Sequence, residues 1–195
     1  MKVHPGARDD EHLERAFREL LIEHGLFTQR DVDEKVEIMH ARSPALGGRV
    51  IARAWFDAAF KARLLRDGSA ALRELGTEAG PLKLVVVENT PDVHNLVVCT
   101  LCSCYPRMLL GLPPDWYKSV DYRSRAVREP RAVLAEFGVE LPPEVTVRVH
   151  DSTADMRYLV LPLRPRGTEH LDEAACATIV TRDAMVGAAV VMPPA

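Results

Sequence analysis

The sequence predicts an α+β protein whose helices come first and whose strands come later. Helical spacing of apolar residues recurs through roughly the first 75 residues. The later segments 82–88 and 95–100 are short and rich in Val, 146–150 alternates with period two, and 157–163 is a further apolar run. Because long helices precede the strands and do not alternate with them, we expect a layered α-β-β-α domain, preceded by a helical arm, and not a repeated βαβ unit.

Residues 1–48 are expected to form the N-terminal helical arm. A first amphipathic helix ends near Gly25, and a second begins at Thr28, with Asp31 three residues on as its capping partner, and stops before Pro44. The apolar stripes of such an arm could pack on the rest of the chain or wrap around a partner subunit. The sequence leaves both possibilities open.

Residues 49–195 are expected to form the second domain. It begins with helical segments, one of them capped by Asp57 and ended by Gly68. After the first two strands, Pro130 suits the first turn of a helix, and Asp172–Met185 is expected to form a last helix.

Composition excludes several functional classes. The 195 residues are 47% hydrophobic and 27% charged with a net charge of -3, so we expect neither disorder nor a nucleic-acid partner. The longest apolar runs fall far short of the ~20 residues of a membrane helix, and the N-terminus lacks an apolar signal core. We therefore expect a cytoplasmic protein without a membrane partner, in which cysteines are ligands or reactive thiols and not disulfides.

The sequence CTLCSC brings the thiols of Cys99, Cys102 and Cys104 within reach of one metal ion. Thiolates select zinc, cobalt, iron or copper on softness alone. A zinc site needs a fourth ligand, such as a histidine or Cys176, although Cys176 lies in a helical pattern where a small core residue fits. The Cys-Ser-Cys end instead makes the peptide nitrogens of Ser103 and Cys104 candidate ligands, which only a strongly Lewis-acidic trivalent ion can deprotonate. A dithiol redox centre is disfavoured by the third thiol.

The sequence around this cluster resembles the alpha chain of nitrile hydratase. The resemblance rests on VVCTLCSCYPRMLLGLPPDWYKS at Val97–Ser119, with further matches that include VVVENTP at Val85–Pro91 and VTRDAMVG at Val180–Gly187. The matching segments span nearly all of the chain past residue 48. The resemblance implies an α+β fold of that type and a nitrile hydratase, a lyase that hydrates a nitrile to an amide.

The resemblance also implies the chemistry of the cluster. Cys99 would be the axial ligand, and Cys102 and Cys104 would be oxidised to sulfinic and sulfenic acid. Thr100 goes with cobalt in this family, so we expect Co(III), with Fe(III) as the second choice. A nitrile bound to the metal would be attacked by the sulfenate oxygen of Cys104 or by an activated water, with Ser103 orienting substrate or water; the sequence does not choose between the two.

The resemblance implies further components. A beta-type subunit would supply arginines to the oxidised cysteines, and a metal-delivery activator protein would load the metal. Within the chain, Arg107, Arg123 and Arg125 could assist, although ion pairs are the ordinary role for the last two. His94 beside a turn, and Asp151, Asp155 and Arg157 at strand ends and turns, are expected to be structural.

Arg107 departs from the family pattern, which has Trp at this position in the substrate pocket. A guanidinium in place of an aromatic wall favours a bulky or polar nitrile, such as a heteroaromatic or nucleoside nitrile. Arg107 also makes thiocyanate hydrolase, whose cobalt subunit has the same cluster, an alternative to nitrile hydratase. A non-catalytic metal-binding protein is the alternative from another class.

Overall fold

The computed structural model describes residues 7–77 and 82–194 of the chain, which divides into two compact units, Met1–Ala41 and Arg42–Ala195. The first unit holds α1, Ala7–Glu23, and α2, Gln29–His40. The predicted capping box is confirmed, since the Thr28 hydroxyl accepts from the Asp31 N–H at 3.2 Å and the Thr28 N–H donates to the Asp31 carboxylate at 2.7 Å. The arm boundary that we placed after residue 48 stays a prediction.

Three helices begin the second unit: α3, Ala45–Phe56, α4, Ala58–Arg66, and α5, Gly68–Glu74. Asp57 caps α4 as predicted, because its carboxylate accepts from the Phe60 N–H at 2.9 Å. These helices contribute buried side chains to the hydrophobic core, among them Val50, Ile51, Phe60 and Leu64.

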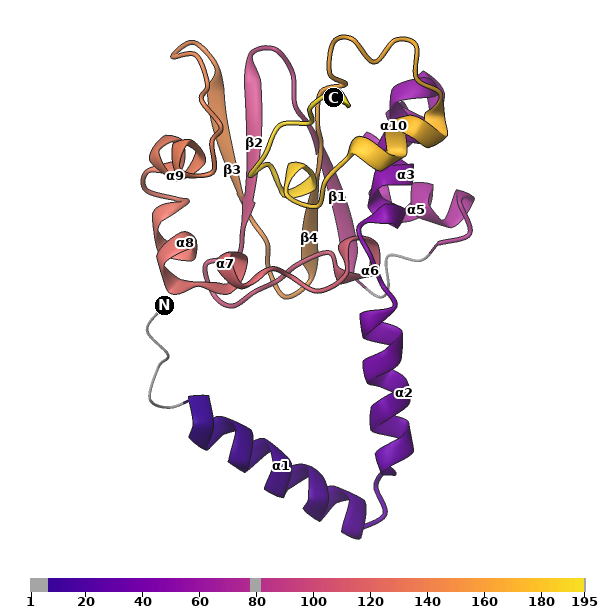
Figure 1. The fold of residues 1–195 in the computed structure, drawn as a ribbon, viewed down its shortest axis with the longest axis vertical. Helices are drawn as coiled ribbons and strands as arrows, with labels where there is room; N and C mark the ends of the chain where they lie inside the picture. Colours follow the sequence, from indigo (N-terminus) through magenta and orange to yellow (C-terminus); the bar gives the residue numbers. More distant parts are fainter. Residues whose placement is uncertain (1–6, 78–81, 195) are drawn as a thin grey trace. The chain divides into compact units, whose positions relative to one another are not determined.

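The four described strands form two parallel pairs that join distant parts of the sequence (Figure 1). Strand β1, Lys83–Glu88, pairs with β4, Met156–Leu161, and β2, Val93–Val98, pairs with β3, Thr146–Asp151. A turn closed by hydrogen bonds between Thr90 and Val93 connects β1 to β2. Because the strands of each pair run in the same direction, β2 and β3 end at the same edge, with Val98 opposite Asp151.

The remaining helices are short, and Figure 1 shows them around the strands: α6, Arg107–Leu110, α7, Asp115–Lys118, α8, Val120–Arg125, α9, Pro130–Glu136, α10, Glu173–Ile179, and the 3-10 helix η1, Ala184–Val186. Our single helix Asp172–Met185 is wrong, because the chain becomes extended at Val180 with ψ 109°. A run of β-branched residues around this position disfavours a continued helix. Gly187 then turns with φ +82°, and a Cβ there would collide with Asn95 O.

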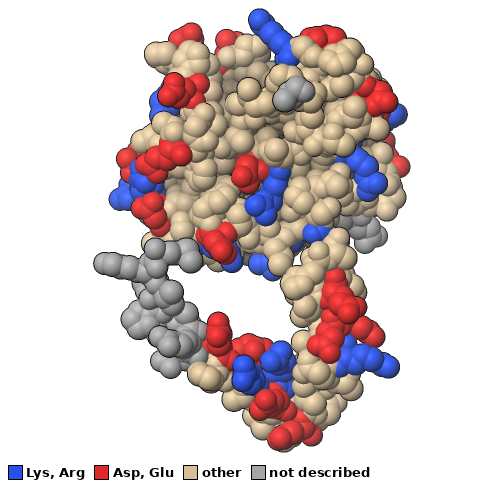
Figure 2. Space-filling model, viewed as in Figure 1, with Lys and Arg blue, Asp and Glu red and all other residues tan. Residues whose placement is uncertain are grey.

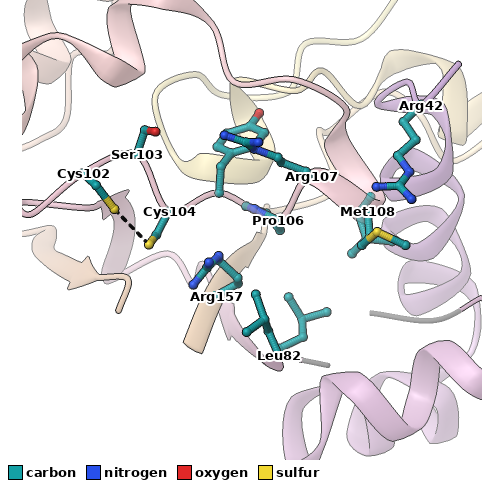
Figure 3. A pocket seen from close by; sticks show the side chains of 12 residues that line it. Arg42, Leu82, Cys102, Ser103, Cys104, Pro106, Arg107, Met108 and Arg157 are labelled. Atoms are coloured by element: carbon teal, nitrogen blue, oxygen red, sulfur yellow. Dashed lines mark hydrogen bonds between the residues drawn. The ribbon is translucent and has the colours of Figure 1, made fainter. Parts of the chain in front are cut away.

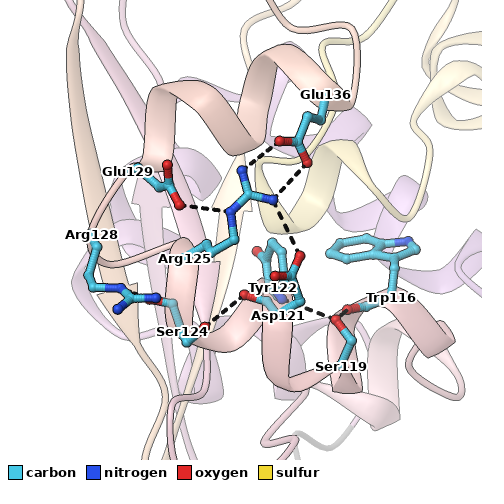
Figure 4. Close-up of polar contacts among 9 residues, drawn as sticks. All are labelled: Trp116, Ser119, Asp121, Tyr122, Ser124, Arg125, Arg128, Glu129 and Glu136. Atoms are coloured by element: carbon cyan, nitrogen blue, oxygen red, sulfur yellow. Dashed lines mark hydrogen bonds and ion pairs between the residues drawn. The ribbon is translucent and has the colours of Figure 1, made fainter. Parts of the chain in front are cut away.

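Ion pairs and aromatic rings join α8 to its neighbours. Arg125 binds Glu129 at 2.8 Å, Glu136, and Asp121 at 3.3 Å, as Figure 4 shows. The expected ion-pair role of Arg125 is therefore confirmed. On the face drawn in Figure 2, acidic and basic side chains of this unit are interspersed, as the small net charge suggests. Across the described residues, the helices lack the combination of length and apolar character that crossing a membrane requires.

Candidate metal centre

The three predicted thiols gather directly after β2. The Sγ atoms of Cys99 and Cys102 lie 3.5 Å apart, those of Cys102 and Cys104 lie 3.3 Å apart, and all three lie within 4.8 Å of one another. Cys99 is buried, Cys104 is half-buried and Cys102 is exposed. One ion can therefore reach all three thiols from the solvent side.

The peptide nitrogens of the cluster also face sulfur. The Cys102 N–H donates to Cys99 Sγ at 3.3 Å. The hydrogen bond from Cys104 is the main cause that lowers the pKa of Cys102, and the N–H groups of Ser103 and Cys104 lower this pKa further. Both amides that we named as candidate ligands thus lie beside the thiols. Their role as ligands stays a prediction, although thiolates of this kind suit a soft or borderline ion.

Burial raises the pKa of the Cys104 thiol to about 12. A metal ion at this sulfur must therefore displace a proton, because the thiolate is the form that binds metals. Burial of Cys104 and exposure of Cys102 make the two outer thiols chemically unequal.

Three side chains hold the backbone of the cluster. The Asp151 carboxylate, at the end of β3, accepts from the Thr100 N–H at 2.9 Å and from the Thr100 hydroxyl at 2.6 Å. Arg123 donates to Thr100 O at 3.3 Å, and the Tyr117 hydroxyl donates to Cys104 O at 2.9 Å. Sequence reasoning placed Asp151 only at a strand end, since its pairing with Thr100 depends on the register of β2 and β3.

A cavity of about 430 Å³ opens beside the cluster (Figure 3). Its lining includes Cys102, Ser103, Cys104 and three arginines, Arg42, Arg107 and Arg157. Arg107 therefore lies where a pocket residue is expected, although its role stays a prediction. Sequence reasoning missed Arg42 and treated Arg157 as a turn residue, because neither is close to the cluster in the sequence.

Other candidate ligands lie elsewhere. Cys176 is buried on α10, and among the described residues the cluster that could hold an ion contains only the three cysteines, without a histidine or a fourth thiol. A tetrahedral zinc site therefore lacks a fourth side-chain ligand there. His94 is buried with its Nε2 2.7 Å from Gly187 O, which confirms its structural placement.

The fold and the cluster define an α+β metal-binding protein whose thiols open on a cavity. The family model described as nitrile hydratase, alpha chain, matches residues 8–189. The chain is 48% identical over 184 residues to the low-molecular weight cobalt-containing nitrile hydratase subunit alpha of Rhodococcus rhodochrous, covering 92% of this chain and 88% of that protein. It is 44% identical over 197 residues to thiocyanate hydrolase subunit gamma of Thiobacillus thioparus, covering 95% and 81%.

Solved structures agree with these relatives. Recombinant thiocyanate hydrolase with partially modified cobalt centres matches with a TM-score of 0.89 and 43% identity, over 98% of this chain and 92% of that one. A double mutant of the Fe-type nitrile hydratase of Comamonas testosteroni Ni1 matches with a TM-score of 0.91 and 42% identity, over 96% and 95%. The chain belongs to the nitrile hydratase alpha-chain family. The expected α+β fold and the expected enzyme class, the alpha subunit of a nitrile hydratase, are confirmed.

Proposed function

We propose that this chain is the metal-binding subunit of a cobalt nitrile hydratase, which adds water to the C≡N bond of a nitrile to give an amide. The observation that carries the proposal is the convergence of Cys99, Cys102 and Cys104 within 4.8 Å of one another beside an open cavity. Relatives named as cobalt-containing support Co(III), and the match to an Fe-type structure keeps Fe(III) as the second choice.

In this proposal, each residue of the cluster has its own role in metal binding or in the reaction. Cys99, buried at the end of β2, anchors the ion, and Cys102, Cys104 and the amides of Ser103 and Cys104 complete the ligand set. When bound, the trivalent ion supplies a Lewis acid that withdraws electrons from the C≡N bond. Cys104 faces the cavity, where its oxidised sulfur, as sulfenate, either attacks the nitrile carbon or orients the water that does. The Ser103 hydroxyl orients substrate or water, and Cys102 is held as sulfinate.

Partner proteins complete the proposal. Leu101, inside the cluster sequence, is 84% exposed, so a beta-type subunit could reach it. Arginines from that subunit would compensate the charge of the oxidised cysteines. An activator protein would deliver the metal. The cytoplasm is the compartment that we propose, because thiols stay reduced there until the metal arrives.

The arginines of the cavity bear on the substrate. Arg107 and its neighbours give the cavity a cationic lining, which supports a bulky or polar nitrile over a small aliphatic one. The same lining, together with the 44% identity to a thiocyanate hydrolase subunit, favours thiocyanate hydrolysis as the second candidate function.

Metal content is the first test. The chain, produced with its beta-type subunit and activator in cobalt-supplemented medium, is expected to hold about one cobalt per chain by elemental mass spectrometry. Cys104→Ser should lose the cobalt and lower the rate of amide formation at least about a thousandfold, because both a ligand and a catalytic group are removed. Cys176→Ser is the matched control, since Cys176 is also buried but lies on α10, outside the cluster.

Mass spectrometry of the peptide that contains Cys102 and Cys104 separates an enzyme from a metal store. Three added oxygen atoms, two on Cys102 and one on Cys104, are expected for the enzyme. Stoichiometric zinc that cobalt does not displace, on unoxidised cysteines, would reject the proposal in favour of a non-catalytic metal-binding protein. Turnover of thiocyanate without turnover of any nitrile would select the second candidate.

A further inference from the structure

We infer that the cavity selects an organic nitrile that carries a carboxylate, with Arg42 binding the negative group. This inference rests on the proposed function, because it assumes that the nitrile end reacts at the cysteine cluster. The first observation is the charge of the cavity. Three of the described residues that line it are arginines and none is acidic.

The cavity arginines also lack carboxylate partners within the described part of the chain. Among the described residues, the arginines that form ion pairs are Arg18, Arg30, Arg53, Arg63, Arg125 and Arg182, so the three arginines of the cavity are not among them. A guanidinium group that lines a cavity without a carboxylate partner among the described residues is suited to bind an anion, and its planar fork matches a carboxylate.

Arg157 has a separate explanation. Its Nη1 donates to the carbonyl oxygens of Thr153, Ala154 and Met156, and its charge lowers the pKa of the nearby Cys104. Figure 3 places it beside Cys104. We therefore assign Arg157 to the charge balance of the cluster and not to the substrate.

Arg42 cannot serve the cluster in that way. In Figure 3 its side chain lies with Met108 at the end of the cavity away from Cys102 and Cys104. Its backbone is fixed there, because Gly111, with φ +72°, approaches so closely that a Cβ would lie 2.6 Å from Arg42 O. Gly111 directly follows α6, which begins with Arg107. The fold thus ties Arg42 to the segment that carries Arg107, and it holds Arg42 at the end of the cavity away from the thiols, where the tail of a bound substrate would lie.

The walls and volume favour an organic anion. Leu82, Leu84, Met108 and Leu109 supply apolar lining to the same cavity. Its volume of about 430 Å³ is in the range of pockets that hold organic ligands. An apolar or aromatic body with the nitrile at one end and a carboxylate at the other matches this arrangement.

The test compares 4-cyanobenzoate with benzonitrile and 4-cyanobenzamide on the cobalt-loaded complex. We expect kcat/KM to be highest for 4-cyanobenzoate and this preference to fall as salt rises. Arg42→Gln should lower kcat/KM for 4-cyanobenzoate roughly tenfold, mainly through KM, and leave benzonitrile within about twofold. Arg49→Gln is the control, because this substitution removes the same charge. Arg49 is exposed on α3 and lines none of the described cavities.

A binding measurement makes the test independent of turnover. Calorimetric titration of the complex with benzoate, which keeps the carboxylate and lacks the nitrile, should give binding that weakens roughly tenfold in Arg42→Gln and not in Arg49→Gln. Hydration of benzonitrile with no preference for 4-cyanobenzoate would overturn the inference and leave the proposed function intact. Turnover of thiocyanate, with 4-cyanobenzoate neither bound nor hydrated, would also overturn it. Absence of all nitrile hydration would reject the proposed function itself.

Discussion

The buried polar side chains at the two ends of β2 differ in how completely they are hydrogen-bonded. At its start, His94 and Asn95 are buried and fully engaged: His94 Nε2 donates to Gly187 O at 2.7 Å, and the Asn95 side chain bonds Asn89 at 2.9 Å and His150 at 2.8 Å. This network joins β2, β3 and the turn after η1. Paired buried polar groups of this kind fix one arrangement of the core.

At the end of β2, the polar groups are not all paired. Among the described residues, three buried side-chain N or O atoms have no hydrogen-bond partner: Tyr105 Oη, Arg123 Nε and Ser152 Oγ. Tyr105 follows Cys104 in the chain, Arg123 binds the backbone of the cluster, and Ser152 follows Asp151. Buried polar atoms are usually paired, so the end of β2 that leads into the cysteines is the less completely hydrogen-bonded of the two ends.

The largest effect on stability is expected at the start of β2. Asn95→Ala removes a side chain that bonds Asn89, His150 and the carbonyl of Glu88, and it leaves these buried partners unsatisfied. We expect the free energy of unfolding to fall by about 3 kcal/mol, measured by urea denaturation. The cobalt content per folded chain should stay unchanged. Loss of cobalt without loss of stability would break the comparison, because it would place Asn95 in the metal site.

Local signals predicted the elements, whereas pairing across the chain could not be predicted. The capping residues Thr28 and Asp57 lie next to the helices that they begin, so the sequence is enough to find them. The three cysteines are likewise local, because six consecutive residues contain them. Asp151 meets Thr100 only through the register of two strands about 50 residues apart, for which neither sequence segment carries a signal.

The cavity illustrates the same limit. Its arginines come from the segment before α3, from α6 and from β4, and only the fold brings them together. The length of the last helix was wrong for a related reason. Its alanine-rich start is a good helix former, but the β-branched residues before η1 and the approach of Gly187 to β2 end the helix after Ile179.

A smaller effect is expected from Asp151, the residue that joins the strand edge to the cluster. Asp151→Asn keeps the shape but weakens the bonds to the Thr100 N–H and hydroxyl, so the backbone that presents the thiols should loosen. We expect the affinity for cobalt(II) to fall about 10- to 100-fold, measured by competition with a chelating dye, as is typical when groups that orient metal ligands are changed. The free energy of unfolding should fall by only about 1 kcal/mol.

Three further variants sharpen the Asp151 experiment. Asp155→Asn is the matched control, because Asp155 lies exposed in the turn between β3 and β4. Thr100→Ser keeps the hydroxyl that bonds Asp151, so it should retain most of the affinity, whereas Thr100→Val should not. Equal affinities for the Asp151 and Asp155 variants would show that the carboxylate does not position the cluster.

The smallest effect is a pH dependence of stability at the start of β2. Burial lowers the pKa of His94, and burial together with the charge of Arg148 lowers the pKa of His150. Both rings are therefore neutral in the folded chain, and the unfolded chain binds protons more readily below about pH 6.5. Stability should be complete above that pH and decline as the pH falls toward the folded-state values, by at most about 1.4 kcal/mol per pH unit for each ring. His94→Gln should flatten this decline in urea denaturation between about pH 7.5 and 5, whereas an unchanged slope would mean that the ring is already charged in the fold and that the network is not paired as described.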